Sequence, residues 1–284
     1  MERAIKTIAV IGLGLIGGSF AKALSVTRDY TVIGWDRDDQ VTASALEDGS
    51  ISASAQNRLN TADLCVIGLY PQDTVRYVKD NLTAFRKNAI IMDLCGVKRY
   101  IHTELEPLCA ERNLRFIGGH PMAGREVSGY MSSSADLFKG ASYILTNSQT
   151  LSANIFGELK DVLSAAGFTK IIESTPTRHD EIIAYTSQLA HVVSSAYVKS
   201  PAADSFDGYS AGSFRDLTRV AKLNEHMWSE LFDLNRDFLA NEIGEIISHL
   251  TAYKHALVNR DTQKLKELLK DGSDIKKRLE SESN

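Results

Sequence analysis

Residues 8–18 read IAVIGLGLIGG, and this stretch decides the fold of the first half of the chain. An apolar strand pattern runs directly into the three glycines of a GxGxxG motif and then into an apolar helix pattern. Gly12 permits the tight turn, Gly14 lets the backbone approach a pyrophosphate, and Gly17 lets the helix pack closely on the strand. The free N–H groups at a helix N-terminus attract an anion. The motif therefore predicts a dinucleotide site.

A carboxylate follows the motif at the expected distance. The second apolar run ends at Asp36, which can accept hydrogen bonds from the adenine ribose hydroxyls and repel a 2′-phosphate, so NAD is favoured over NADP. Arg37 is the neighbour that could pair with such a phosphate. The other cofactor-binding candidates are Leu15 and Ile16 within the motif, and Leu69 and Tyr70 after a later strand. The alternative is an ordinary tight turn in a fold that binds no nucleotide.

Short β-branched runs alternate with amphipathic stretches through the first 174 residues. Such alternation predicts a mostly parallel sheet covered by helices. The predicted strands are 5–11, 30–35, 64–68, 89–93, 115–117, 143–146 and 170–173. Together with the glycine motif they predict an α/β Rossmann-type dinucleotide-binding domain over residues 1–174.

After residue 174 the apolar residues recur every three or four positions, which predicts an all-α C-terminal domain over residues 175–284. An apolar stripe from Trp228 to Leu257 spans about eight helical turns. A single helix of that length is longer than one small domain needs, so we expect it to pack against a second subunit and form a homodimer. The alternative is that neighbouring helices of the same chain cover the stripe.

Composition narrows the partners and the location. The 284 residues carry a formal net charge of -4, which gives no attraction for polyanions and argues against nucleic acid. Nowhere do about 18 uncharged apolar residues follow one another, so neither a signal peptide nor a membrane span is predicted, and we expect a cytoplasmic protein with a small-molecule ligand. The three cysteines match no metal or redox spacing, so no metal site is predicted.

His120 directly follows an apolar strand, where a histidine can titrate near neutral pH; a lone loop histidine is more often structural. Its surroundings change that reading. The chain resembles the prephenate and arogenate dehydrogenases from about Ile5 to at least Trp228. The resemblance is carried by IGLGLIGGS (11–19), DLCGVK (93–98), GGHPMAGRE (118–126), HDEIIAYTSQLAH (179–191) and SFRDLTRVA (213–221).

The resemblance implies the oxidative decarboxylation of a cyclohexadienyl dicarboxylate with NAD, on the tyrosine pathway. His120 is then the catalytic residue: it bonds the ring hydroxyl and takes up its proton as hydride leaves the same carbon. His191 and Arg219 are then substrate-binding residues, and an arginine fork suits a carboxylate. Arg215 can share a helical face with Arg219 or simply face solvent. Arg125 is a further substrate candidate that could instead pair with Glu126 or with the helical domain.

Helical spacing favours His191 over His179 as a site residue. Asp180, Ala184, Ser187 and His191 share one face, which we expect to turn a polar strip toward the cleft. His179 lies on a neighbouring line, and we assign it a capping or interdomain contact.

Two departures from the family pattern leave alternatives open. Gly96 stands where many members have a serine, and Gln188 and Ala190 replace residues of an S-H-L-P-H motif. The substrate could be prephenate or arogenate. The chain could also be a hydroxyacid dehydrogenase or imine reductase of similar build, or a non-catalytic NAD-binding module.

Overall fold

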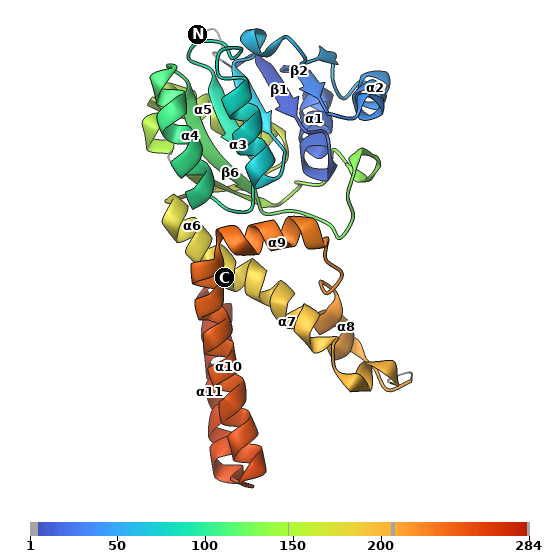
Figure 1. Ribbon diagram of the computed structural model, residues 1–284, viewed down its shortest axis with the longest axis vertical. Coiled ribbons are helices and arrows are strands. Elements are labelled where there is room, and N and C mark those ends of the chain that lie inside the picture. Colours follow the sequence, from blue (N-terminus) through green and yellow to red (C-terminus); the bar gives the residue numbers. More distant parts are fainter. Residues whose placement is uncertain (1–4, 147, 206–207, 283–284) are drawn as a thin grey trace. The chain divides into compact units, whose positions relative to one another are not determined.

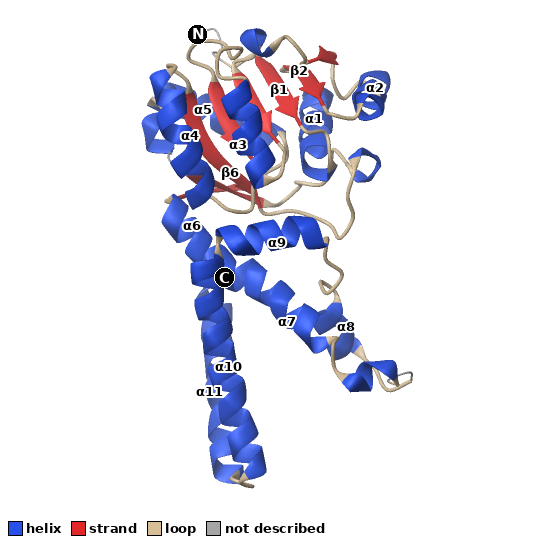
Figure 2. Ribbon diagram, viewed as in Figure 1, coloured by secondary structure: helices blue, strands red, loops and turns tan. Residues whose placement is uncertain are grey.

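The computed structural model describes residues 5–146, 148–205 and 208–282. The chain up to Ser174 forms an eight-stranded sheet with the order β3-β2-β1-β4-β5-β6-β7-β8. Its strands are drawn in red in Figure 2. The strands are β1 Thr7–Ile11, β2 Thr31–Trp35, β3 Ala53–Ser54, β4 Leu64–Ile67, β5 Ile90–Asp93, β6 Arg115–Pro121, β7 Ser142–Thr146 and β8 Lys170–Ser174. Neighbours are parallel except that β7 runs antiparallel to β6. The strands β1, β2, β4, β5 and β6 therefore all end at one edge.

Helices cover both faces of the sheet, as Figure 1 shows. The cause is alternation along the strands: Ile8 and Val10 of β1 face one apolar cluster, whereas Ala9 and Ile11 face the other. The helices α1 Leu15–Thr27, α2 Asp39–Glu47 and α5 Ala153–Ala165 contribute to the first cluster. The helices α3 Pro71–Asp80 and α4 Arg99–Glu111 contribute to the second. The predicted Rossmann-type fold class is confirmed.

All seven predicted strands are present, with ends that differ by a few residues. The two-residue strand β3 was not predicted, because a pattern of period two cannot be recognised over two residues. The strand β6 is longer than predicted and includes His120, which pairs with Ile144 of β7. His120 thus lies in a strand rather than at the start of a loop.

The chain is helical after β8. The helices are α6 Pro176–Ile183, α7 Ala190–Tyr197, α8 Gly212–Thr218 and α9 Glu225–Leu234, with a π-helical segment at Ala184–Leu189 between α6 and α7. Short 3-10 turns lie at Leu59–Thr61, Tyr130–Ser132, Ser148–Thr150 and Pro201–Asp204. The hydroxyl of Thr175 caps α6 by accepting from the amide of Arg178, and Pro176 occupies the first helical position.

The single helix expected from Trp228 to Leu257 is wrong. Helix α9 ends at Leu234, and a new helix α10 runs from Arg236 to Val258. Between them the buried Asn235 leaves the helical conformation, with φ -120° and ψ 22°. Its Nδ2 donates to the carbonyl of Asp180 and to Oε1 of Gln188, both at 2.9 Å. These tertiary hydrogen bonds outweigh the helical pattern.

From Arg236 onward the chain forms a compact unit of its own. It consists of α10 and of α11, Thr262–Glu282, joined by a short turn. The hydroxyl of Tyr253 donates to the carbonyl of Leu268 at 3.1 Å and ties the two helices together. Within the described residues, no helix combines the length and the apolarity needed to cross a membrane.

Candidate active site

The glycine turn after β1 accepts no other residue at two of its positions. Gly12 has φ +83°, and a Cβ there would lie 2.6 Å from the carbonyl oxygen of Gly68. A Cβ at Gly17 would lie 1.9 Å from the carbonyl oxygen of Gly12. Around Gly14 the described structure leaves open space, and no described side chain caps the helix that this residue begins. The first amides of α1 are thus available to an anion.

Asp36 lies at the carboxyl end of β2, beside this turn. Its Oδ2 accepts from the amide of Leu13 at 2.8 Å, and its Oδ1 accepts from the amide of Asp38 at 3.0 Å. Each carboxylate oxygen can accept a second hydrogen bond, so both remain able to bind ribose hydroxyls. Arg37 is exposed on the same edge. The turn and the carboxylate fit a dinucleotide.

The remaining cofactor candidates lie at the same edge. Leu15 and Ile16 open α1 and are partly exposed. Leu69 follows β4, and its carbonyl accepts from the hydroxyl of Thr74 at 3.2 Å. Tyr70 precedes α3 and is 43% exposed. The structure therefore brings the predicted cofactor residues to one edge of the sheet.

His120 lies at this edge too, three strands from the glycine turn, or about 14 Å at the usual strand spacing. Two glycines precede it because the backbone is crowded there. A Cβ at Gly119 would lie 2.1 Å from the hydroxyl of Tyr143, and one at Gly118 would lie 2.2 Å from Oγ1 of Thr146. This crowding fixes the backbone from which the imidazole projects.

The imidazole of His120 belongs to a chain of hydrogen bonds that starts in α6. Its Nδ1 lies 2.8 Å from Nε2 of His179, and Nδ1 of His179 lies 2.7 Å from Oδ1 of Asp180. Burial holds the pKa of His120 well below its usual value, and the nearby His179 and Lys98 lower it further. Burial also lowers the pKa of His179. Both imidazoles are therefore neutral near pH 7.

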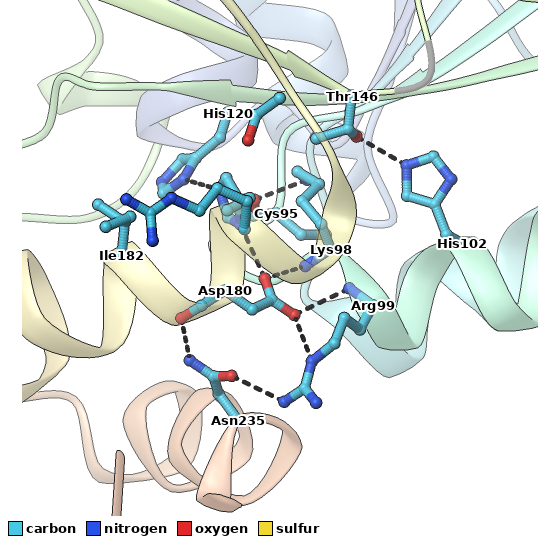
Figure 3. Close-up of polar contacts among 12 residues, drawn as sticks. Cys95, Lys98, Arg99, His102, His120, Thr146, Asp180, Ile182 and Asn235 are labelled. Atoms are coloured by element: carbon cyan, nitrogen blue, oxygen red, sulfur yellow. Dashed lines mark hydrogen bonds and ion pairs between the residues drawn. The ribbon is translucent and has the colours of Figure 1, made fainter. Parts of the chain in front are cut away.

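Asp180 joins this chain to α4 (Figure 3). Its two oxygens accept from the amides of Lys98 and Arg99, at 2.7 and 2.9 Å, at the N-terminus of α4. Burial opposes ionisation of Asp180, but the hydrogen bond from His179 and those from the two amides overcome it and lower the pKa of the carboxyl. Asp180 is therefore an ionised cap of α4.

A buried ion pair lies behind the histidines. The side chains of Lys98 and Asp93 are wholly buried and bonded to each other, and Nζ of Lys98 also donates to the carbonyl of Cys95 at 2.8 Å. The charge of Lys98 is close enough to disfavour protonation of both His120 and His179. This cation therefore helps to keep the imidazole of His120 a free base.

A second group of side chains surrounds His191. Its ring lies 3.9 Å from that of Trp228 between centroids, and its Nδ1 lies 2.8 Å from the carbonyl of Ser187. Arg219 is 66% exposed and forms an ion pair with Glu126, one residue after Arg125. Burial lowers the pKa of His191, and the charge of Arg219 lowers it further.

The four predicted substrate residues are not all brought together. The charge of Arg219 acts on His191, and the side chains of Arg125, Arg215 and Arg219 are all exposed. In the part of the chain that the structure describes, no hydrogen bond or ion pair links His120 to any of these four. The expected polar strip is wrong in its first half, because Asp180 and Ala184 are wholly buried and only Ser187 and His191 are partly exposed.

Sequence reasoning left His179 and Lys98 out of the site, and it placed Asp180 on the polar strip without giving it a partner. The available signal was the adjacent His–Asp pair at the start of a helix, since an imidazole beside a carboxylate has a fixed orientation. Trp228 was assigned to the dimer stripe, yet its ring contacts His191.

Gly96 leaves room beside the imidazole. A Cβ at this position would lie 3.5 Å from Cδ2 of Leu231 and 3.9 Å from Nε2 of His120. Nε2 of His120 therefore faces Gly96, and a Cβ there would make only ordinary van der Waals contacts. Gln188, which departs from the family motif, is buried and has a structural role. Its Nε2 donates to the carbonyl of Leu231, and its Oε1 accepts from the side chain of Asn235.

A glycine turn, a carboxylate beside it and a neutral imidazole on one edge of a Rossmann-type sheet are typical of a dinucleotide-dependent dehydrogenase. Residues 20–172 match the nucleotide-binding domain of prephenate dehydrogenase, and residues 175–271 match its dimerization domain. The chain belongs to the prephenate dehydrogenase family.

Two curated relatives match this chain over nearly its whole length. The cyclohexadienyl dehydrogenase of Zymomonas mobilis is 30% identical over 98% of this chain and 97% of its own. The prephenate dehydrogenase of Lactococcus lactis is 28% identical over 97% of this chain and 78% of its own. Among solved structures, the prephenate dehydrogenase of A. aeolicus in complex with hydroxyphenyl propionate and NAD+ is 25% identical, with a TM-score of 0.86 over 98% of this chain and 100% of its own.

Proposed function

We propose that the chain oxidises and decarboxylates prephenate to 4-hydroxyphenylpyruvate, with NAD as the cofactor. The observation that carries this proposal is the neutral imidazole of His120, held at the edge of the sheet that also bears the glycine turn. The proposal is supported by the similarity to prephenate dehydrogenases, one of which has been solved in complex with NAD+.

Two features of the chain fit NAD. The open space at Gly14 and the amides of α1 would hold the pyrophosphate, and Asp36 would bind the adenine ribose. Bound NAD would supply the hydride acceptor. Leu15, Ile16, Leu69 and Tyr70 would line its path, and the carboxylate of Asp36 disfavours a 2′-phosphate.

The residues of the chain would act on the substrate as follows. Nε2 of His120 accepts the proton of the ring hydroxyl while hydride leaves the same carbon. The ring carboxylate then departs as carbon dioxide, and the electrons of the broken carbon–carbon bond complete the aromatic ring. His120 returns the proton to the phenolic oxygen. Arg219 would bind a substrate carboxylate through its guanidinium. His191, on which the charge of Arg219 acts, would line the same part of the substrate site.

The test follows the absorbance of the reduced cofactor as it forms. Prephenate and arogenate are assayed in parallel, each with NAD and with NADP. We expect turnover of prephenate with NAD. Arogenate is the second candidate, because an arogenate dehydrogenase of Synechocystis is 27% identical with a TM-score of 0.80. If arogenate alone is turned over, arogenate and not prephenate is the substrate. No NADH formation with either would favour a non-catalytic NAD-binding module.

We further propose that a domain boundary lies at residue 174, that the chain forms homodimers through α10, and that it is cytoplasmic. The boundary is supported by the two family matches, which end and begin at residues 172 and 175. The dimer is supported by the match to a dimerization domain and by four exposed apolar side chains of α10: Ile247, Leu250, Leu257 and Val258.

A further inference from the structure

We infer that His179, oriented by Asp180, is a positioning residue that holds His120 as the tautomer with its proton on Nδ1, so that Nε2 is free. The inference rests on the proposed role of His120 as the base. It follows from the order of donors and acceptors along one chain of side chains.

The chain of hydrogen bonds starts from groups whose role is fixed. Backbone amides can only donate, and Asp180 accepts from those of Lys98 and Arg99. The carboxylate therefore acts as an acceptor throughout. The remaining contact of its Oδ1, at 2.7 Å, is with Nδ1 of His179, which must carry the proton.

The next step fixes His120. A neutral imidazole has one N–H, so a His179 protonated on Nδ1 offers Nε2 as an acceptor. The facing atom at 2.8 Å is Nδ1 of His120, which must then donate. Nε2 of His120 is left without a proton, and it is the atom that faces Gly96.

The charges around the pair favour two neutral rings. His120 faces His179 and Lys98, while His179 faces Asp180, with Lys98 and Asp93 nearby. The side chain of His179 is wholly buried, and Lys98 is already paired with Asp93. When Nε2 takes a proton, the same hydrogen bond to His179 supports the new charge, because a bond from a charged donor is stronger than a neutral one.

The first measurement needs no substrate. The full-length protein with 15N-labelled histidine is studied by NMR, because a nitrogen that bears a proton and a bare one differ clearly in chemical shift. We expect His120 to be protonated on Nδ1 and bare on Nε2 near pH 7. A wild-type His120 protonated on Nε2 would overturn the inference, whether or not the protein oxidises prephenate.

Two variants separate positioning from packing. His179→Leu removes the acceptor, so we expect His120 to gain an Nε2-protonated form and kcat to fall roughly 10²-fold, with a small change in KM. His179→Gln keeps an acceptor for His120 and a donor for Asp180, so we expect the tautomer and most of kcat to be retained. His226→Gln, at an exposed histidine of α9, is the matched control.

The outcomes separate this inference from the proposed function. An unchanged tautomer in folded His179→Leu would overturn the inference. If that variant does not fold, the wild-type protein and His179→Gln decide. Both should show His120 protonated on Nδ1, and loss of this form in either protein would overturn the inference. If the tautomer is as expected but neither prephenate nor arogenate is oxidised, the positioning role stands and the proposed reaction falls.

Discussion

Contacts of both the backbone and the imidazole ring determine the chemical properties of His120. Strand β6 fixes its backbone through pairing with Ile144, and His179 fixes its ring through Nδ1. Burial and the charge of Lys98 keep the ring neutral. A neutral imidazole with one nitrogen free is suited to accept a proton near pH 7.

Replacing His120 tests its role as the base. We expect His120→Asn to lower kcat by roughly 10²–10⁴-fold with little change in KM, because the amide keeps a polar side chain but cannot take up the proton. Steady-state kinetics with prephenate and an NAD titration would measure this. Normal turnover by this variant would remove His120 from the catalytic step.

Replacing Arg219 tests the substrate-binding group. We expect Arg219→Ala to raise the KM for prephenate on the order of 10- to 100-fold, since a hydrogen bond to a charged group contributes about 1.5–3 kcal/mol. Arg178→Ala is the matched control, because Arg178 is an exposed arginine of α6 with its own partner, Glu181. Equal KM values for the two variants would place Arg219 outside the substrate site.

At the scale of elements, the joint between β1 and α1 is the tightest part of the nucleotide site. We expect Gly17→Ala to weaken NAD binding at least about 10-fold and to destabilise the fold, because the new Cβ would meet the carbonyl oxygen of Gly12 at 1.9 Å. Gly157→Ala in α5 is the control. No described atom lies within 4 Å of that Cβ, so a gain of about 0.5–1 kcal/mol is expected there. Calorimetric NAD titration and thermal unfolding would distinguish the two.

The sequence predicted the elements well where a local pattern fixes them. The strands of the sheet and the glycine turn follow from periodicity and backbone sterics over a few neighbouring residues. The break at Asn235 could not be found this way, because its hydrogen-bond partners lie 47 and 55 residues away in the chain. The pairing of His120 with His179 has the same cause, since 59 residues separate them.

At the scale of the whole molecule, the exposed apolar face of α10 predicts self-association. Ile247 is 56% exposed and Leu250 is 60% exposed. We expect Ile247→Glu to shift the protein from dimer to monomer in sedimentation equilibrium, because a charge in an apolar interface loses its hydration. Ser248→Glu is the control, since the next residue points about 100° around the helix. A variant with unchanged mass would exclude this face from the interface.

Stability should fall on acidification below neutral pH. Four histidines have pKa values lowered in the folded state: His102, His120, His179 and His191. Below the ordinary histidine pKa of about 6.5, the unfolded chain binds protons that the folded chain does not, so the folded state loses stability until its own lower pKa values are reached. Each group contributes at most about 1.4 kcal/mol per pH unit.

Urea unfolding at pH 7.5, 6.5 and 5.5 would measure this loss. We expect the free energy of unfolding to decrease at each step, and His179→Gln to decrease less because one titrating group is gone. A free energy that stays constant or rises toward pH 5.5 would contradict the lowered pKa values.

The carboxylate of Asp180 serves two purposes at once. Lys98, Arg99 and His120 belong to the segment that matches the nucleotide-binding domain of the family, whereas His179 and Asp180 belong to the segment that matches the domain after it. All five residues lie in one compact unit of the chain, and Asp180 joins the two segments to each other. A substitution that removed this carboxylate would therefore leave α4 without its cap and His179 without its acceptor, so helix stability and imidazole orientation depend on the same two oxygens.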